Sequence, residues 1–159
     1  MRCLITGGAG FVGSNLAASL ISEGHRVSVL DNLQREGTAN NIQWLASIGE
    51  YEFQQNDIRN RDFCDEFIHS FKPDVIFHLA GQVAMTTSLA DPRLDYETNV
   101  TGTINILEAV RQKLPKCVVA FASTNKVYGD LSQISTSEQN TRYVPDDNLH
   151  AFDEDLPLN

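Results

Sequence analysis

The chain has 159 residues, 42% apolar and 21% charged, so it is long and apolar enough to bury the core of one soluble domain. Its net charge of -9 leaves no basic surface for a phosphate backbone, which excludes DNA and RNA as expected partners. No apolar run approaches the roughly 20 residues that cross a bilayer, and no secretory segment precedes Cys3. We therefore expect a cytoplasmic protein without a membrane partner.

In chain order, short runs of β-branched residues alternate with segments of helical periodicity. The first strand leads through a glycine-rich turn into a helix that stops at Gly24, and the second strand ends at Asp31. Pro73 and Pro115 end later helices because proline cannot continue them. The predicted strands are 3–6, 26–30, 51–55, 74–79 and 117–122. The predicted helices are 12–22, 38–48, 60–71 and 91–113.

Two of these helices start at capping residues. Asn60 can cap the helix over 60–71, and Asp91 with Pro92 forms an N-cap and first-turn pair for the last helix. The small, polar stretch 80–89 between them is predicted as a loop. Helical spacing predicts an apolar face on the last helix that includes Leu94, Val100, Ile104, Leu107 and Val110.

Five strands joined by helices require right-handed crossovers between parallel strands. We therefore predict an α/β fold, a Rossmann-type doubly wound parallel sheet with strand order 3-2-1-4-5. In such a sheet the ligand crevice lies outside the carboxyl ends of the strands. The candidate functional residues of this chain all follow strand ends.

The composition changes after Gly129. Residues 131–159 are rich in Ser, Gln and Asn and then in acidic residues, and no helix or strand of useful length is predicted there. We divide the chain into a Rossmann-type domain over 1–130 and a polar, acidic tail over 131–159. Such a tail is either disordered or a substrate-facing loop.

The chemistry begins at the turn over 6–13, which reads TGGAGFVG. Glycines allow a sharp turn and a close approach to a pyrophosphate, and the following helix N-terminus presents unpaired N–H groups. The glycines fit either Gly8-x-Gly10-x-x-Gly13 or Gly7-x-x-Gly10-x-x-Gly13. With a strand before it, a helix after it and an acid beyond it, this turn predicts a dinucleotide site.

Two carboxylates follow later strand ends. Asp31 can accept hydrogen bonds from ribose hydroxyls and would repel a 2'-phosphate, which favours NAD, although Arg35 nearby keeps NADP open. Asp57 could meet the adenine amino group or cap the next turn.

The histidines and cysteines indicate no metal site. His78 lies in an apolar strand and is interpreted as a core residue without a functional role. The other histidines lack metal-ligand spacing, and the three cysteines are expected to be reduced, small core residues.

Several segments together resemble the extended short-chain dehydrogenase/reductases over nearly the whole chain. They are TGGAGFVG, Asp31-Asn32-Leu33, Asp57-Ile58, HLAGQVAMTTS at 78–88, Asn99 and STNKVYGD at 123–130. Within that superfamily the chain is similar to NAD-dependent nucleotide-sugar epimerases and dehydratases, and its AGQVAMTTS and STNKVYGDL segments resemble the CDP-paratose 2-epimerase branch. The family's glycine spacing is G-x-x-G-x-x-G, which selects the arrangement Gly7-x-x-Gly10-x-x-Gly13.

The resemblance implies NAD as cofactor and assigns residues to each part of it. The residues implied to hold the pyrophosphate are Gly7, Gly10, Phe11, Val12 and Gly13. Asp31 and Asn32 would bind the adenosine ribose, and Asp57 and Ile58 the adenine. The nicotinamide side would be lined by Leu79, Ala80 and Gly81. Asn99 is implied to be structural. Thr124 matches the family's catalytic Ser/Thr, whose hydroxyl hydrogen-bonds the reacting sugar oxygen.

The family's Tyr-x-x-x-Lys pair is not found in these residues. The positions four after the tyrosines hold Gln55, Val100, Ser132 and Asp147. The resemblance therefore implies the N-terminal, truncated part of an isomerase of carbohydrate metabolism, an epimerase acting on a nucleotide sugar, first of all a CDP-sugar, and inactive alone. An exposed fifth strand also predicts self-association.

Two alternatives stay open. The parent could be a nucleotide-sugar dehydratase or reductase, although Asn125-Lys126 replaces the acidic residues that dehydratases carry after the catalytic Ser/Thr. The chain could also be a non-catalytic NAD-binding or interaction module.

Overall fold

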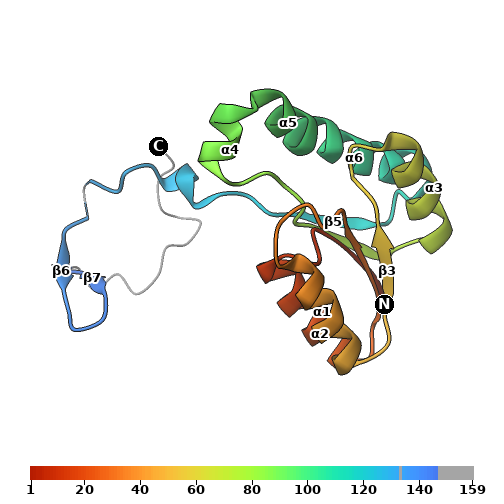
Figure 1. Ribbon diagram of the computed structural model, residues 1–159, viewed down its shortest axis with the longest axis horizontal. Helices are drawn as coiled ribbons and strands as arrows, with labels where there is room; N and C mark the ends of the chain where they lie inside the picture. Colours follow the sequence, from red (N-terminus) through yellow and green to blue (C-terminus); the bar gives the residue numbers. More distant parts are fainter. Residues whose placement is uncertain (133, 147–159) are drawn as a thin grey trace. The chain divides into compact units, whose positions relative to one another are not determined.

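The computed structural model describes residues 1–132 and 134–146. The chain divides into one compact unit from Met1 to Ala122 and a second that begins at Ser123. In the first unit a five-stranded sheet lies between two layers of helices (Figure 1). Its strands pair in parallel in the order β3-β2-β1-β4-β5, which confirms the predicted Rossmann-type sheet. The strands are β1 (Arg2–Thr6), β2 (Arg26–Asp31), β3 (Glu52–Gln55), β4 (Val75–His78) and β5 (Val118–Phe121).

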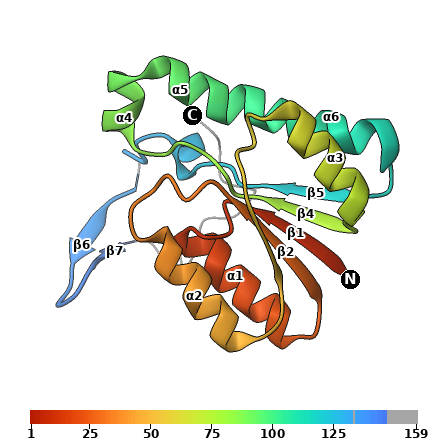
Figure 2. The same ribbon diagram turned by 45° about the vertical axis from the view of Figure 1, so that its right-hand side comes forward.

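Each face of the sheet has its own helices and its own core. Helices α1 (Phe11–Ser22) and α2 (Thr38–Ile48) cover one face, and α3 (Arg61–Phe71) and α6 (Thr103–Lys113) cover the other (Figure 2). Successive strand residues point to opposite faces, so Cys3 and Ile5 face α1 while Leu4 faces α3.

The two core clusters are both apolar. The α1–α2 cluster comprises Cys3, Ile5, Ala17, Leu20, Ile21, Val27, Val29 and Leu45. The α3–α6 cluster comprises Leu4, Leu30, Ile58, Cys64, Phe67, Ile68, Phe71, Ile76, Ile106, Ala109 and Val110. Both predicted caps are confirmed, since Asn60 accepts the N–H of Phe63 at 3.2 Å and Asp91 accepts that of Leu94 at 2.9 Å.

The segment between β4 and β5 differs from the prediction in two ways. The stretch expected as a loop contains a helix, α4 (Met85–Ala90), which buries no residue and so has no apolar periodicity. The last helix is continuous, but its middle is a π-helical turn, η1 (Glu97–Gly102), between α5 (Pro92–Tyr96) and α6.

The predicted apolar face of this helix is partly wrong. Val110 is buried, but Val100, Ile104 and Leu107 are 40%, 53% and 45% exposed, while Asn105 and Ile106 face the core. A π turn holds one more residue than an α turn. The extra residue changes which side chains point at the sheet.

The second unit, described by itself, contains a 3-10 helix, η2 (Asn125–Tyr128), and an antiparallel hairpin of β6 (Thr136–Glu138) and β7 (Tyr143–Pro145). The expectation of no helix or strand of useful length after residue 131 did not anticipate this hairpin, because three-residue strands are too short to show alternation. The predicted acidic tail from residue 147 onward lies outside the described residues. Within the described chain, no helix has the length and apolarity needed to span a membrane.

Candidate functional site

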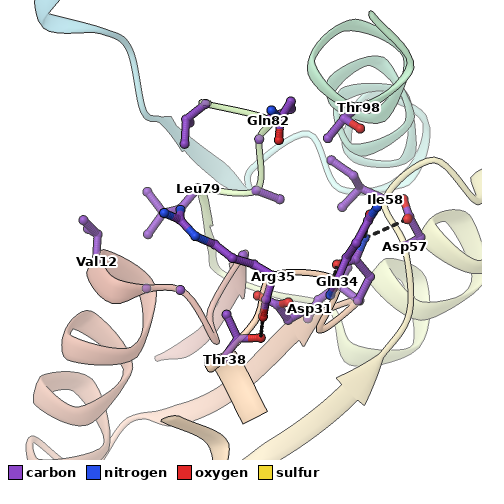
Figure 3. A pocket seen from close by; sticks show the side chains of 18 of the residues that line it. Val12, Asp31, Gln34, Arg35, Thr38, Asp57, Ile58, Leu79, Gln82 and Thr98 are labelled. Atoms are coloured by element: carbon purple, nitrogen blue, oxygen red, sulfur yellow. Dashed lines mark hydrogen bonds between the residues drawn. The ribbon is translucent and has the colours of Figure 1, made fainter. Parts of the chain in front are cut away.

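A cavity of about 600 Å³ opens at the carboxyl edge of the sheet (Figure 3). All the residues that the sequence assigned to a dinucleotide line it: Gly7, Gly10, Phe11, Val12, Gly13, Asp31, Asn32, Asp57, Ile58, Leu79, Ala80 and Gly81. The sequence assigned no site role to further lining residues: Gln34, Thr38, Asn56, Gln82, Val83, Ala84, Thr87, Leu94 and Thr98.

The floor of the cavity is the glycine-rich turn. Gly7 has a φ of 69°, which favours glycine, and its N–H donates to Leu30 O at 2.8 Å. A Cβ on Gly7 would lie 2.7 Å from Ala80 N, and one on Gly13 would overlap the carbonyl oxygen of Gly7. The turn can therefore pack against β4 and α1 only with glycine at both positions.

The first turn of α1 forms one side of this floor. The helix follows Gly10, which has no side chain to cap it, and Phe11 and Val12 are 83% and 62% exposed. The N–H groups of an uncapped first turn carry a partial positive charge. This end of the cavity is suited to an anionic group.

Asp31 joins the floor to the loop after β2. Its Oδ2 accepts the N–H of Ala9 at 3.0 Å, and its Oδ1 accepts that of Leu33 at 2.9 Å. Leu33 itself has a φ of 56°, a strained conformation for a residue with a side chain. The carboxylate thus fixes two backbone segments at the cavity edge.

Asp57, which follows the neighbouring strand β3, is held by a cation. Arg59 donates from Nε at 3.0 Å, from its second terminal nitrogen at 2.8 Å and from its backbone N–H at 2.9 Å. Asn32 donates a further hydrogen bond at 2.9 Å. Burial alone would raise the pKa of Asp57, but these bonds outweigh it and lower the pKa to about 2. Of the two roles left open, capping of the next turn is present in the structure.

The cavity wall after β4 is tied to the π turn. The Asn99 side chain accepts the N–H of Gln82 at 2.8 Å and donates to Gln82 O at 2.9 Å. This is the structural role that the resemblance implied for Asn99. Thr87 and Thr98 reach the cavity from helices, and no local pattern marks them as lining residues.

The loop over 34–38 adds a cation to the cavity. Arg35 lines it, and within the described part of the chain its guanidinium forms no ion pair (Figure 3). Thr38 is buried and donates to Arg35 O at 2.7 Å, which closes the loop. The signal that could have found Gln34 and Thr38 is their place between the strand end that carries Asp31 and the start of the next helix, α2.

Thr124 lies in the second unit, at the N-cap of η2. Its Oγ1 accepts the N–H of Lys126 at 3.2 Å, and the residue is exposed. No group of three His, Cys, Asp or Glu side chains suited to a metal ion occurs among the described residues.

Comparisons with known proteins agree on one family. The sequence model of the GDP-mannose 4,6 dehydratase family matches residues 4–147. The chain is 51% identical to CDP-paratose 2-epimerase of Salmonella typhi, over 99% of this chain and 47% of that protein. It is 41% identical to UDP-glucose 4-epimerase of Mycolicibacterium smegmatis, over 87% and 44%.

A solved structure shows the same fold. The UDP-glucose 4-epimerase of Thermus thermophilus, in complex with NAD, is 35% identical with a TM-score of 0.73, over 91% of this chain and 45% of that one. The chain thus spans about half the length of these relatives.

The Asp57–Arg59 pair predicts a specific dependence of stability on pH. The pKa of Asp57 falls from 3.8 to about 2 on folding, so the ionised carboxylate stabilises the folded state. Its contribution to the free energy of unfolding is complete above about pH 4 and is lost as the pH falls through 2. We expect Asp57→Asn to reduce the acid-side loss of unfolding free energy by up to about 2 kcal/mol, measured by urea unfolding from about pH 5 to 2. Glu66→Gln on the exposed side of α3 is the control. Equal pH slopes for wild type and Asp57→Asn would contradict the assignment.

Proposed function

The chain belongs to the GDP-mannose 4,6 dehydratase family of nucleotide-sugar epimerases and dehydratases, and on this basis we propose that it is the NAD-binding part of a nucleotide-sugar epimerase. The observation that carries the proposal is the cavity itself. It brings together, from four separate segments, every residue that the strand ends and family motifs of the sequence assigned to the cofactor.

The floor fits a pyrophosphate. Gly10 lines the cavity, and a Cβ there would lie 3.1 Å from Gly7 O, so a larger residue would narrow the space above the turn. We propose that Gly7, Gly10 and Gly13 allow the close approach and that the first turn of α1 binds the phosphates. Arg35 supplies a second positive group for the same anion.

The carboxylates fit the adenosine end. Asp31 uses each oxygen once for a backbone N–H, and each oxygen keeps acceptor capacity for a ribose hydroxyl. A carboxylate at this position disfavours a 2'-phosphate, which supports NAD over NADP. Asn32, Asp57 and Ile58 would line the adenine side, and Leu79, Ala80 and Gly81 the nicotinamide side.

When bound, NAD would accept a hydride from the sugar carbon that carries the reacting hydroxyl. It would return the hydride to the other face of that carbon, whose configuration is then inverted. We propose that the Thr124 hydroxyl contacts the reacting sugar oxygen. Its oxygen already accepts the N–H of Lys126, and its own hydrogen can be donated to the sugar. The similarity to CDP-paratose 2-epimerase supports an epimerase rather than a dehydratase, and a CDP-sugar as substrate.

The first experiment measures cofactor binding. We expect Gly10→Val to weaken NAD binding by roughly tenfold or more, because its branched side chain enters the pyrophosphate space. Wild type should also prefer NAD to NADP. Titration calorimetry measures both, and Ala46→Val, which adds the same group on the exposed side of α2, is the control. Unchanged NAD affinity in Gly10→Val would overturn the site assignment.

The second experiment measures turnover. These 159 residues contain Thr124 but no tyrosine with a lysine four positions later. A hydroxyl without a paired phenolate is a poor general base, so we expect no conversion of a CDP-3,6-dideoxyhexose. Chromatography of the nucleotide sugars after incubation with NAD checks this, with the Salmonella typhi relative as positive control. Detectable product from the 159-residue chain would refute the expectation.

We also propose self-association through β5, the edge strand of the sheet beside β4. Val118 and Phe121 are 62% and 60% exposed there, and an exposed apolar edge invites pairing with a second copy.

Val118→Lys places a charge on this edge and should shift the chain towards monomer. Ala46→Lys, with the same side chain on α2, should not. Sedimentation velocity measures the difference, and a monodisperse wild-type monomer would contradict the proposal.

A further inference from the structure

The buried imidazole of His78 joins two hydroxyl groups from different elements. The residue ends β4 and is 1% exposed. Its Nδ1 lies 2.7 Å from Thr6 Oγ1, and its Nε2 lies 3.0 Å from Thr103 Oγ1. Burial lowers the pKa of His78 to about 4, so the ring is neutral at pH 7. In a neutral imidazole one nitrogen donates and the other accepts.

The surrounding bonds decide which nitrogen carries the hydrogen. Thr103 Oγ1 donates to Asn99 O at 2.7 Å, and a hydroxyl has only one hydrogen. Thr103 must therefore accept from Nε2–H of His78. Nδ1 is then the acceptor and takes the hydroxyl hydrogen of Thr6, whose oxygen accepts the N–H of Ala80 at 3.2 Å. In this arrangement both ring nitrogens of His78 and both threonine hydroxyls have a hydrogen-bond partner.

The two ends of this hydrogen-bond chain lie at functionally different places. One end is the backbone of Ala80 in the cavity wall, against which Gly7 packs so closely that a Cβ would lie 2.7 Å from Ala80 N. The other end is the Asn99 carbonyl in the π turn. The side chain of Asn99 in turn binds the backbone of Gln82 on both its N–H and its carbonyl.

We propose that His78, as the Nε2-protonated tautomer, is a positioning residue that holds the Ala80–Gln82 wall of the cavity in register with the π turn. The wall is hydrogen-bonded at Ala80 to Thr6 and at Gln82 to Asn99. The imidazole of His78 joins these two bonds, because it binds Thr6 directly and Asn99 through the Thr103 hydroxyl. Its benefit to cofactor binding rests on the proposed function, whereas the hydrogen-bond chain itself does not.

A histidine that only fills space would behave differently. Packing depends on the shape of the ring and is indifferent to which nitrogen is protonated. It is also nearly indifferent to replacement of Thr103 by valine, which has almost the same shape but no hydroxyl. Thr103→Val and Thr103→Ser therefore form a matched pair, since only serine keeps the acceptor for Nε2–H.

The first measurement is the ¹⁵N spectrum of the imidazole in the wild-type protein near pH 7, without cofactor. We expect the signature of the neutral ring protonated at Nε2. A ring protonated at Nδ1, or a charged ring, would overturn the proposal. This result needs no variant, so it holds even if Thr103→Val does not fold.

The second measurement is amide hydrogen exchange in the matched pair. Thr103→Val should speed exchange at Ala80 and Gln82 by roughly tenfold relative to Thr103→Ser, while the core amide of Val29 in β2 stays unchanged. Unchanged exchange at Ala80 and Gln82, or an equal increase at Val29, would refute the positioning role. Neither readout uses NAD, so a failure of the cofactor assignment is seen separately in the titration of wild type.

Discussion

Parallel pairing of β1 with both of its neighbours is the constraint on which the cavity depends. In this register Thr6 lies opposite Leu30 of β2 on one side and His78 of β4 on the other. The three strands end at one level, so the turns that follow them meet. A slip of one residue in either pairing would turn the side chains to the opposite face of the sheet. The glycine floor, Asp31 and the wall after β4 would then no longer surround one space.

The charge of the cavity is not that of the whole chain. The net charge is -9, yet both carboxylates at the cavity are already engaged, Asp31 by two backbone N–H groups and Asp57 by Arg59. The uncapped start of α1 and the guanidinium of Arg35 remain as positive groups. An acidic chain can therefore offer a local site for an anion, because the nearby dipoles and charges decide the local potential.

The sheet order and the cavity lining could be predicted because their signals are local. Buried strands appear as short apolar runs, and the residues that follow them must meet at one edge. The π turn could not, because the contact of Asn99 with Gln82 joins segments 17 positions apart. The exposure of Ile104 and the hydrogen bonds of His78 also depend on contacts between distant segments, so they could not be predicted from the sequence. Helix α4 could not be predicted because it buries no side chain that would mark a period.

The central position of β1 also determines the order in which the core can be completed during synthesis. The α1–α2 cluster is built from residues up to Leu45, whereas the α3–α6 cluster requires Ile106 and Val110. The second edge of β1 can pair only after β4 is synthesised, because the partner of Thr6 there is His78, 72 positions later. A nascent chain released only as far as β3 thus carries Leu4 and Leu30 on a face that α3 and α6 do not yet cover, and contacts of such long range slow folding.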